Sequence, residues 1–308
     1  MANQIKLNPI QQTLHDLSYD VKKIYCVWGR GTGKSSYGIG TIIRNIIHFL
    51  PRSKWLIVAE SYRSMLENTL PATVRALESI GYYRDIHYVI GKRPPVRWPT
   101  SYEPPVHGFK NTITFFNGTS FQLVSQDSSA TSPRGLNTDG IIVDEALNLD
   151  KEHYDEEILP TKRANQLVFK NVPFHMGEFF FSSMPYSTNA EWLTNNISYY
   201  LEDGKDQPQL MDSLIGRQVD FLKERSRVHQ RKIWQEITEL RRRITWYSKR
   251  VNREKTLYLE SNAFDNIRVL GYDYIYSLYK NTNTIRFMTE IMNKRMLKPE
   301  GGFYAKFE

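Results

Sequence analysis

The chain has 308 residues and a formal net charge of +8, and its 40% hydrophobic and 13% aromatic content predicts a sizeable packed core rather than disorder. No stretch approaches 18 consecutive apolar residues, so no membrane span is expected, and the narrow apolar stripe of the basic helix predicted below argues against a membrane partner. The lone cysteine, Cys26, cannot form an internal disulfide, which favours a reducing, cytosolic setting over a secreted disulfide scaffold.

The first predicted elements surround a glycine-rich turn. Asn8-Pro9-Ile10-Gln11 precedes a short helix. Gln11 is a candidate to read the adenine edge by paired hydrogen bonds, although an exposed glutamine is the commoner fate. Ile24 to Trp28 is predicted to be a buried strand, and a helix is predicted from about Lys34 to Leu50.

The segment that joins this strand to this helix predicts a phosphate-binding loop. Glycines let backbone N–H groups converge on phosphate oxygens, and the helix amino terminus adds positive potential. Lys34 is expected to reach the β- and γ-phosphates, and the Ser35 hydroxyl to bind Mg²⁺. The usual pattern G-x-x-x-x-G-K-[ST] has glycine where this chain has Trp28, so we interpret the loop as a variant. The predicted nucleotide-binding residues are Gln11, Gly29, Arg30, Gly31, Thr32, Gly33, Lys34, Ser35 and Ser36.

The following residues alternate short apolar runs with helical stretches, the pattern of an α/β domain with a mostly parallel sheet. A helix is predicted over residues 65–80, and five prolines predict an irregular loop over residues 91–108. Asn117-Gly118 predicts a β-hairpin, because its tight turn requires positive φ. The strands expected after the first are residues 55–59, 113–116, 120–124, 141–143 and 178–182.

One of these strands ends in two adjacent carboxylates, Asp144 and Glu145, about 110 residues after the loop. Asp144 is expected to hold the Mg²⁺ shell, and Glu145 to orient and deprotonate the attacking water. An apolar run ending in Asp-Glu can also be a strand that enters a polar loop. Downstream of a phosphate loop in this fold pattern, the pair indicates ATP hydrolysis.

Two arginines and a polar strand end could complete the site. Arg30 lies inside the loop and could contact the γ-phosphate of its own site. Arg134, in Ser132-Pro133-Arg134-Gly135, could supply the same charge or make an ordinary surface ion pair. The later strand ends with Ser182, Ser183 and Pro185, which could sense the γ-phosphate and couple hydrolysis to movement.

Beyond about residue 200 the strand signal fades, and helices are predicted to dominate, the last two over residues 272–279 and 283–295. Residues 221–255 contain twelve Lys or Arg and four Glu, so this segment accounts for the whole net charge. Apolar residues recur from Ile233 to Val251 at alternating four- and three-residue steps, which predicts an amphipathic helix. Its basic flanks could be a solvated surface or a surface that tracks nucleic-acid phosphates. The candidate DNA-binding residues are Arg241, Arg242, Arg243, Lys249 and Arg250.

In this order, the motifs resemble the ATPase half of the large terminase subunit, the DNA-packaging motor of tailed bacteriophages. The match rests on Gln11, on the arginine-bearing phosphate loop, on Arg134-Gly135 before Asp144-Glu145, and on the Ser182 strand end. Phe264-Asp265-Asn266 and the helices after it also resemble the family. The resemblance implies a three-layer P-loop NTPase fold of the RecA/ASCE type, with a mostly parallel central sheet and a helical subdomain. The implied domains are an ATPase core over residues 1–200 and a helix-rich extension or lid over residues 201–308.

The resemblance also implies cofactors, partners and a place of action. ATP and Mg²⁺ are the expected cofactors. Family members use a ring of subunits, a pentamer by resemblance, to drive double-stranded DNA into a preformed capsid, with a portal protein and a small terminase subunit as partners. In such a ring Arg134 would act across a subunit boundary, and Arg30 within its own subunit. The place of action would be the cytoplasm of the infected bacterial host, transiently at the procapsid portal, with no lasting place in the virion.

Family members usually continue into a nuclease domain of the RNase H type. The chain is expected to stop about where that domain would begin, with Gly301-Gly302 as a hinge or linker near its end. We therefore predict no nuclease residues here.

Two other functions fit parts of the pattern. A helicase of the two-lobed type would need a second RecA-like lobe, and the region after residue 200 shows no second set of alternating strands. A nucleotide-dependent switch or capsid-assembly adaptor would bind ATP without turning it over, and Glu145 argues for turnover.

Overall fold

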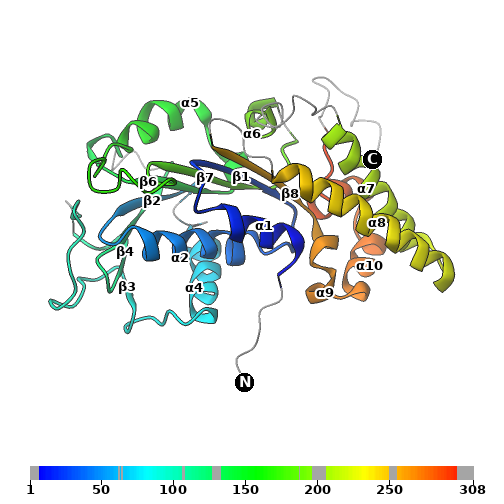
Figure 1. The fold of residues 1–308 in the computed structure, drawn as a ribbon, viewed down its shortest axis with the longest axis horizontal. Coiled ribbons are helices and arrows are strands. Elements are labelled where there is room, and N and C mark those ends of the chain that lie inside the picture. The colour runs from blue at the N-terminus through cyan, green and yellow to red at the C-terminus, as the bar shows by residue number, and fades with distance from the viewer. Residues whose placement is uncertain are drawn as a thin grey trace.

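A mixed but mostly parallel sheet forms the centre of the molecule (Figure 1). The structure is a computed structural model that describes residues 7–61, 63, 65–105, 108–126, 133–186, 188–195, 206–249 and 255–296. Within these residues the sheet has eight strands in the order β3-β4-β5-β2-β6-β7-β1-β8. They are β1 (Lys23–Trp28), β2 (Lys54–Ala59), β3 (Tyr88–Ile90), β4 (Thr112–Phe115), β5 (Ser120–Ser125), β6 (Gly140–Asp144), β7 (Gly177–Ser182) and β8 (Thr256–Ser261).

The strand directions place the predicted motifs at one edge of the sheet. All neighbours from β5 to β8 are parallel, whereas β3 and β4 are antiparallel additions. Strand β7 lies between β1, which leads into the glycine-rich loop, and β6, which ends at Asp144. Parallel strands end at the same edge, so the loop, the carboxylates and the Ser182 strand end meet there.

Both faces of the sheet are covered, which explains why its strands are continuous apolar runs. Along β1 the side chains alternate, with Ile24 and Cys26 in one buried cluster and Tyr25 and Val27 in the other. The Cys26 side chain has no exposed surface, and burial raises the pKa of its thiol.

Helices form the two outer layers (Figure 1). One face carries α1 (Pro9–Leu17), α2 (Ile39–Phe49) and α4 (Leu70–Ser79). The other carries the short α5 (Lys151–His153) and α6 (Trp192–Asn195), together with turns over residues 146–148 and 154–161. The predicted three-layer α/β architecture, with a mostly parallel central sheet and a helical subdomain, is therefore confirmed.

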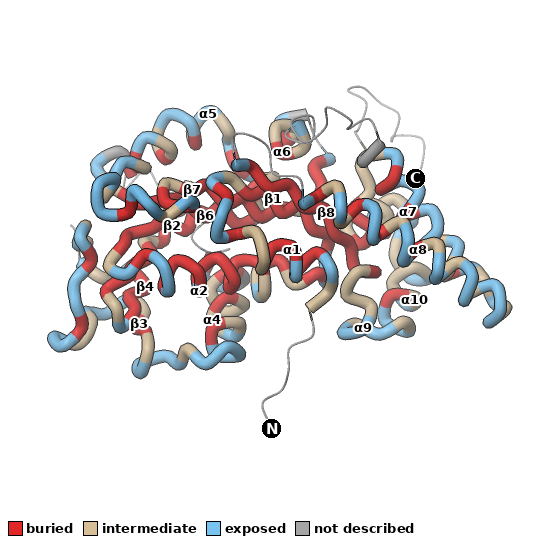
Figure 2. The backbone as a smooth tube through the Cα atoms, viewed as in Figure 1, coloured by how far each residue is buried: buried red, intermediate tan, exposed pale blue. Residues whose placement is uncertain are grey.

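Beyond the sheet lies a helical extension with its own hydrophobic core. It consists of α7 (Asp206–Lys223), α8 (Arg227–Ser248), α9 (Ile267–Leu270), α10 (Tyr272–Asn281) and α11 (Thr284–Arg286), followed by a π-helical turn (Phe287–Ile291). Leu214, Ile244, Phe264 and Ile275 are fully or almost fully buried in this core. The far end of the α7–α8 hairpin is exposed (Figure 2). Among the helices that the structure describes, none combines the length and the apolar character needed to cross a membrane.

The sequence predictions hold for most elements, but they omit β3 (Tyr88–Ile90) and fail at two further places. The predicted hairpin is confirmed as β4 and β5, with Gly118 at a φ of +83°. Helices dominate the described residues after residue 200, as expected, but the fading strand signal hid one strand, since residues 256–261 form β8 and pair with β1. The expected last helix is also shorter, since the helical turns after Asn283 end at Ile291. Gly301 and Gly302 lie outside the described residues.

Candidate nucleotide-binding site

The turn between β1 and α2 has the backbone of a phosphate-binding loop. Gly31 and Gly33 have φ values of +82° and +84°, which residues with side chains rarely adopt. At Gly29 an added Cβ would lie 3.0 Å from the Ile291 carbonyl oxygen, so a side chain there would push against the neighbouring backbone. Residues 34–38 form a π-helical turn that continues into α2, and this places a helix amino terminus at the loop.

Side chains on both sides hold this loop in place. The Thr32 hydroxyl donates to the Gly29 carbonyl oxygen at 2.7 Å. The Gln11 amide nitrogen donates to the Thr32 carbonyl oxygen at 3.0 Å, and the Gln11 amide oxygen accepts from the Asn8 N–H at 3.1 Å. Gln11 therefore braces the loop, and its predicted contact with adenine stays a prediction.

Trp28 does not belong to the loop. It is the last residue of β1, only 1% of its surface is exposed, and its ring lies 3.6 Å from where a Cβ on Gly38 would be. The indole is thus packed in the hydrophobic core, beneath the helical turn that follows the loop. The departure from the usual motif changes the packing under the loop and leaves the Gly-Lys-Ser core intact.

The predicted lysine and glutamate meet at the sheet edge. The Lys34 Nζ lies 2.8 Å from Glu145 Oε1 and 3.3 Å from Ser183 Oγ, so it contacts the ends of β6 and β7 together. The Lys34 side chain is 10% exposed and the Glu145 side chain 40% exposed. A half-exposed carboxylate paired with an almost buried ammonium group is accessible to both water and phosphate.

Asp144 and Glu145 have different surroundings although they are adjacent. Asp144 is buried, and its Oδ2 accepts a hydrogen bond from the Thr69 hydroxyl at 2.6 Å. Burial raises the pKa of Asp144, and the Lys34 charge offsets part of that rise. Glu145 has a left-handed backbone with a φ of +51°, a conformation that is costly without glycine and is concentrated at functional sites.

The residues predicted to hold Mg²⁺ suit that ion. Ser35, half-buried at the first turn after the loop, and Asp144 both offer oxygen, the donor that Mg²⁺ prefers. The Asp144 carboxylate is desolvated, and the nearby ammonium group of Lys34 is bonded to Glu145 instead. Burial disfavours the negative charge of the Asp144 carboxylate, and a divalent cation beside it would compensate that charge.

The two candidate arginines are differently placed. The Arg30 guanidinium pairs with the Glu290 carboxylate at 3.1 Å, and Glu290 also pairs with Arg286 at 3.0 Å. Arg30 would have to leave this pair to contact a phosphate. Arg134 lies in a short 3-10 turn (Pro133–Gly135) that leads to β6, and its side chain is outside the described part of the structure.

The end of β7 is connected to the helical extension. Ser182 and Pro185 are buried, and Ser183 contacts Lys34 as described above. The next residue, Met184, donates its N–H to Asn293 Oδ1 at 2.9 Å, and Asn293 Nδ2 donates to the Val27 carbonyl oxygen at 2.8 Å. Asn293 thus bridges β7 and β1 from the extension, a role that no sequence motif indicated. Thr69, beside Asp144, was missed for the same reason.

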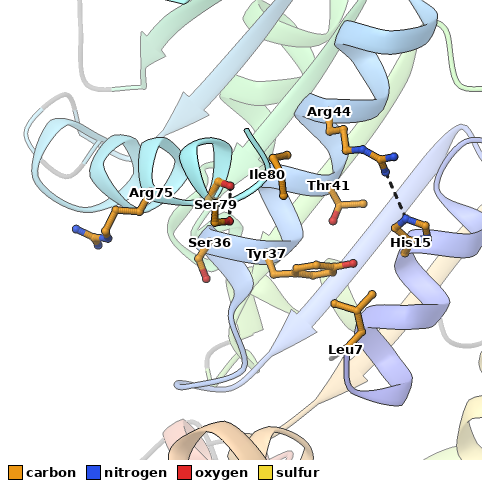
Figure 3. Close-up of a pocket in the computed structure, with 11 residues that line it drawn as sticks. Leu7, His15, Ser36, Tyr37, Thr41, Arg44, Arg75, Ser79 and Ile80 are labelled. Carbon is orange, nitrogen blue, oxygen red and sulfur yellow. Dashed lines mark hydrogen bonds between the residues drawn. The ribbon is translucent and has the colours of Figure 1, made fainter. Parts of the chain in front are cut away.

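A cavity of about 420 Å³ opens beside the start of α2, between α1 and α4 (Figure 3). Ser36 and Tyr37 line the cavity and follow the phosphate loop directly in the sequence, so the cavity lies next to the loop. On the α1 side, Arg44 Nη1 and His15 Nε2 are 3.3 Å apart. Such a volume with mostly apolar walls and a few polar groups suits a small organic ligand. The wall comprises Leu7, His15, Ser36, Tyr37, Gly40, Thr41, Arg44, Arg75, Ala76, Ser79 and Ile80.

Comparison with known proteins gives a result at the level of structure. No protein-family model and no curated protein matches this sequence. Among solved structures, the large terminase of a thermophilic bacteriophage is similar, with a TM-score of 0.58 at 11% identity over 96% of this chain. Complexes of the same phage terminase with ADP and with ATP-γ-S have TM-scores of 0.53, at 12% and 11% identity, over 94% of this chain.

The chain has the large terminase fold. It spans 55% of the length of the phage terminase in the first comparison, and 53% and 52% in the ADP and ATP-γ-S complexes. The resemblance inferred from Gln11, the phosphate loop and the Asp144-Glu145 strand is therefore confirmed at the level of the fold.

Within this terminase fold the basic helix predicted over residues 233–251 is α8, and its apolar stripe packs into the extension core. One candidate DNA-binding residue is wrong: Arg241 is buried and pairs with the buried Asp265, so it faces the core. Arg242 is exposed but pairs with Glu239 on the same helix at 2.9 Å. Arg243 and Lys249 are exposed, and Arg250 lies outside the described residues.

Proposed function

We propose that this chain is the ATPase part of a large terminase, which hydrolyses ATP to move double-stranded DNA into a viral procapsid. The observation that carries the proposal is the meeting of Lys34 and Glu145, 2.8 Å apart, at the carboxyl edge of a parallel sheet. The terminase fold supports it, as do the ADP and ATP-γ-S complexes of the similar phage terminase.

In the proposed reaction, the β- and γ-phosphates of ATP bind the loop and draw Lys34 away from Glu145. Glu145 then accepts a proton from a water molecule while the water oxygen attacks the γ-phosphorus. The bond from this phosphorus to the β–γ bridging oxygen breaks, which gives ADP and phosphate. Mg²⁺ held by Ser35 and Asp144 would neutralise charge on the phosphates.

The base and ribose are proposed to occupy the cavity beside Tyr37. The first turn of the π-helix joins the loop to this cavity through Ser36 and Tyr37, so a nucleotide with its phosphates at Lys34 can extend into it. The half-buried Tyr37 ring provides an aromatic surface for the base. Gln11, at 3.0 Å from the Thr32 carbonyl oxygen, would set the position of the loop relative to the base.

Assembly and force transmission are proposed from the resemblance. In a ring of subunits, Arg134 would stabilise the charge on the transferred phosphoryl group of a neighbour, and Arg30 that of its own site. Ser182, Ser183 and Pro185 would pass the loss of the γ-phosphate to an extension over residues 201–308, with residues 1–200 as the ATPase core. The portal protein and the small terminase subunit would be the partners at the procapsid of the infected cell.

A two-lobed helicase is not favoured, because the described residues form one sheet and a helical extension rather than two similar sheets. The remaining alternative is a switch that binds ATP without hydrolysing it, and a measurement of ATP hydrolysis distinguishes it from a motor.

Steady-state ATP hydrolysis by the wild type and by Glu145→Gln decides between a motor and a switch. A general base contributes roughly 10²–10⁴-fold, so we expect a loss of at least about a hundredfold in Glu145→Gln. Glu156→Gln, the same change at an exposed position of the following turns, is the control for losing a carboxylate. Equal rates for wild type and Glu145→Gln would rule out catalysis by this carboxylate.

A further inference from the structure

A groove of about 360 Å³ lies where the α7–α8 turn meets α10, at the end of the molecule farthest from β3 and β4 (Figure 1). Three tyrosines from one side of α10 and three cationic side chains from both elements line it. These six residues are Tyr272, Tyr276, Tyr279, Lys223, Arg225 and Lys280.

The tyrosine rings form a fixed platform. Tyr272 and Tyr276 are stacked with centroids 5.6 Å apart, and Tyr279 lies 6.4 Å from Tyr276. Contacts with Phe221 at 5.9 Å and with Phe287 at 5.5 Å anchor the two ends of the row in the extension core. No described residue bonds to the three hydroxyl groups, and none of them is among the buried unpaired polar atoms. The platform therefore presents hydroxyl groups to solvent.

The cations of the groove have no neutralising partners. Lys223, Arg225 and Lys280 are exposed, and within the described ranges no carboxylate lies within ion-pair distance of them. Lys280 lies over the ring faces of Tyr276 and Tyr279, at 5.6 and 5.8 Å from their centroids.

The acidic residue of the groove, Glu224, is engaged elsewhere. It accepts the Ser226 N–H at 2.7 Å, where α8 begins, and its other oxygen is 3.8 Å from His229. The adjacent helix start adds more charge, because Arg227, Arg231 and Lys232 are also exposed.

We propose that this groove binds the phosphodiester backbone of duplex DNA. Arginine, lysine and tyrosine hydroxyl groups are the side chains that contact phosphate oxygens without reading sequence, as a motor requires. The inference rests on the proposed function and relocates its DNA contact. The basic surface lies at the α7–α8 turn, whereas the run 241–243 in the last third of α8 has one arginine buried and one paired.

Binding of a short mixed-sequence DNA duplex, measured by fluorescence anisotropy over a range of salt concentrations, tests this proposal. Removing three phosphate contacts in Lys223→Gln/Arg225→Gln/Lys280→Gln should reduce the log–log salt slope by about 2–3. The triple Tyr→Phe variant at 272, 276 and 279 should weaken binding several-fold with the slope unchanged, because the lost groups are neutral. Circular dichroism checks that both variants are folded.

The matched control removes the same charge from the α/β part, in Lys22→Gln/Lys110→Gln/Lys170→Gln, three exposed lysines. Its slope should stay within about one of the wild-type slope. An unchanged slope in the groove variant, or an equal loss in the control, overturns the proposal. Altered sedimentation with intact DNA binding would assign the groove to a second copy of the chain and overturn it too. A wild type that binds no DNA would instead defeat the DNA-moving function as a whole, whereas ATP hydrolysis is tested separately through Glu145.

Discussion

Lys34 and Glu145 are 111 positions apart in the sequence, yet their charged groups lie 2.8 Å apart. The pair uses the same ammonium group that the phosphates of ATP would need and the same carboxylate that would activate water. Binding must therefore break the pair before hydrolysis can begin. Before ATP binds, the ion pair therefore keeps Lys34 from contacting phosphate and Glu145 from activating water.

This competition predicts how Glu145→Gln changes affinity. Removing the carboxylate charge frees Lys34, so we expect ATP to bind up to about fivefold more tightly, the equivalent of the ~1 kcal/mol of a partly exposed ion pair. Isothermal titration with ATP measures the affinity. Lys34→Ala, which removes the phosphate contact itself, should bind ATP at least about a hundredfold more weakly. Weaker binding by Glu145→Gln than by the wild type would contradict the competition.

The cavity beside the loop predicts a selective effect at Tyr37. If the base packs on its ring, Tyr37→Ala should weaken ATP binding by about tenfold, within the 1–3 kcal/mol of base stacking. Tripolyphosphate, which lacks a base, should bind both proteins equally. Tyr19→Ala, an exposed tyrosine just after α1, serves as control. A parallel loss for ATP and tripolyphosphate would mean that Tyr37 shapes the loop and not a base site.

At the scale of elements, α8 shows how far a pattern in sequence reaches. The four- and three-residue spacing of apolar residues predicts the helix, and Ile237 and Ile244 are indeed buried. The spacing does not predict that Arg241 lies among them, because its partner Asp265 is on another element. A buried ion pair is invisible to a method that counts charges along one helix.

This pairing predicts a stability effect rather than a binding effect. Arg241→Gln leaves Asp265 buried without its cation, so we expect the free energy of unfolding to fall by about 3 kcal/mol. Arg243→Gln, at an exposed position two residues on, should change it by no more than about 0.5 kcal/mol. Urea unfolding followed by circular dichroism measures both. Equal stability of the two variants would show that the pair contributes nothing.

The same limit explains which parts of the fold and site were predictable. Strands β1, β2, β6 and β7 are apolar on both faces, so local composition is enough. Strand β8 was missed because its apolar run is only residues 257–259 and ends at Glu260, a buried carboxylate that pairs with Arg295. The loop, Asp144 and Glu145 carry a local motif, whereas Thr69 and Asn293 act only through residues distant in sequence.

At the scale of the whole molecule, the helical extension contacts the phosphate loop at two points and the strands beside it at a third. Asn266 Nδ2 donates to the Gly31 carbonyl oxygen at 2.8 Å, and the Arg30 N–H donates to the Glu290 carbonyl oxygen at 2.8 Å. Asn293 provides the third point, between β1 and β7. Any shift of the loop on nucleotide binding would therefore reach the extension through these contacts.

Asn293 allows this coupling to be tested. Its φ is +55°, so Asn293→Gly keeps the backbone and removes the bridging amide, whereas Asn293→Ala also adds backbone strain of order 1–3 kcal/mol. If DNA bound to the extension stimulates ATP hydrolysis, as the proposed motor requires, we expect both variants to reduce that stimulation by about 0.5–2 kcal/mol of coupling, roughly two- to thirtyfold. Hydrolysis with and without DNA measures it. Wild-type stimulation in Asn293→Gly would show that the bridge transmits nothing.

The position of Cys26 makes its thiol a natural probe of opening of the central sheet. This thiol, the sole one in the sequence, is paired in register with Phe181 and Leu259 on the neighbouring strands and has no solvent-accessible surface. A thiol reagent can reach Cys26 only when the strands in the middle of the sheet separate. The rate of alkylation in native buffer therefore measures how often the sheet opens at this position. A nucleotide bound to the loop at the end of β1 should lower the alkylation rate of Cys26, so its binding can be followed without an engineered label.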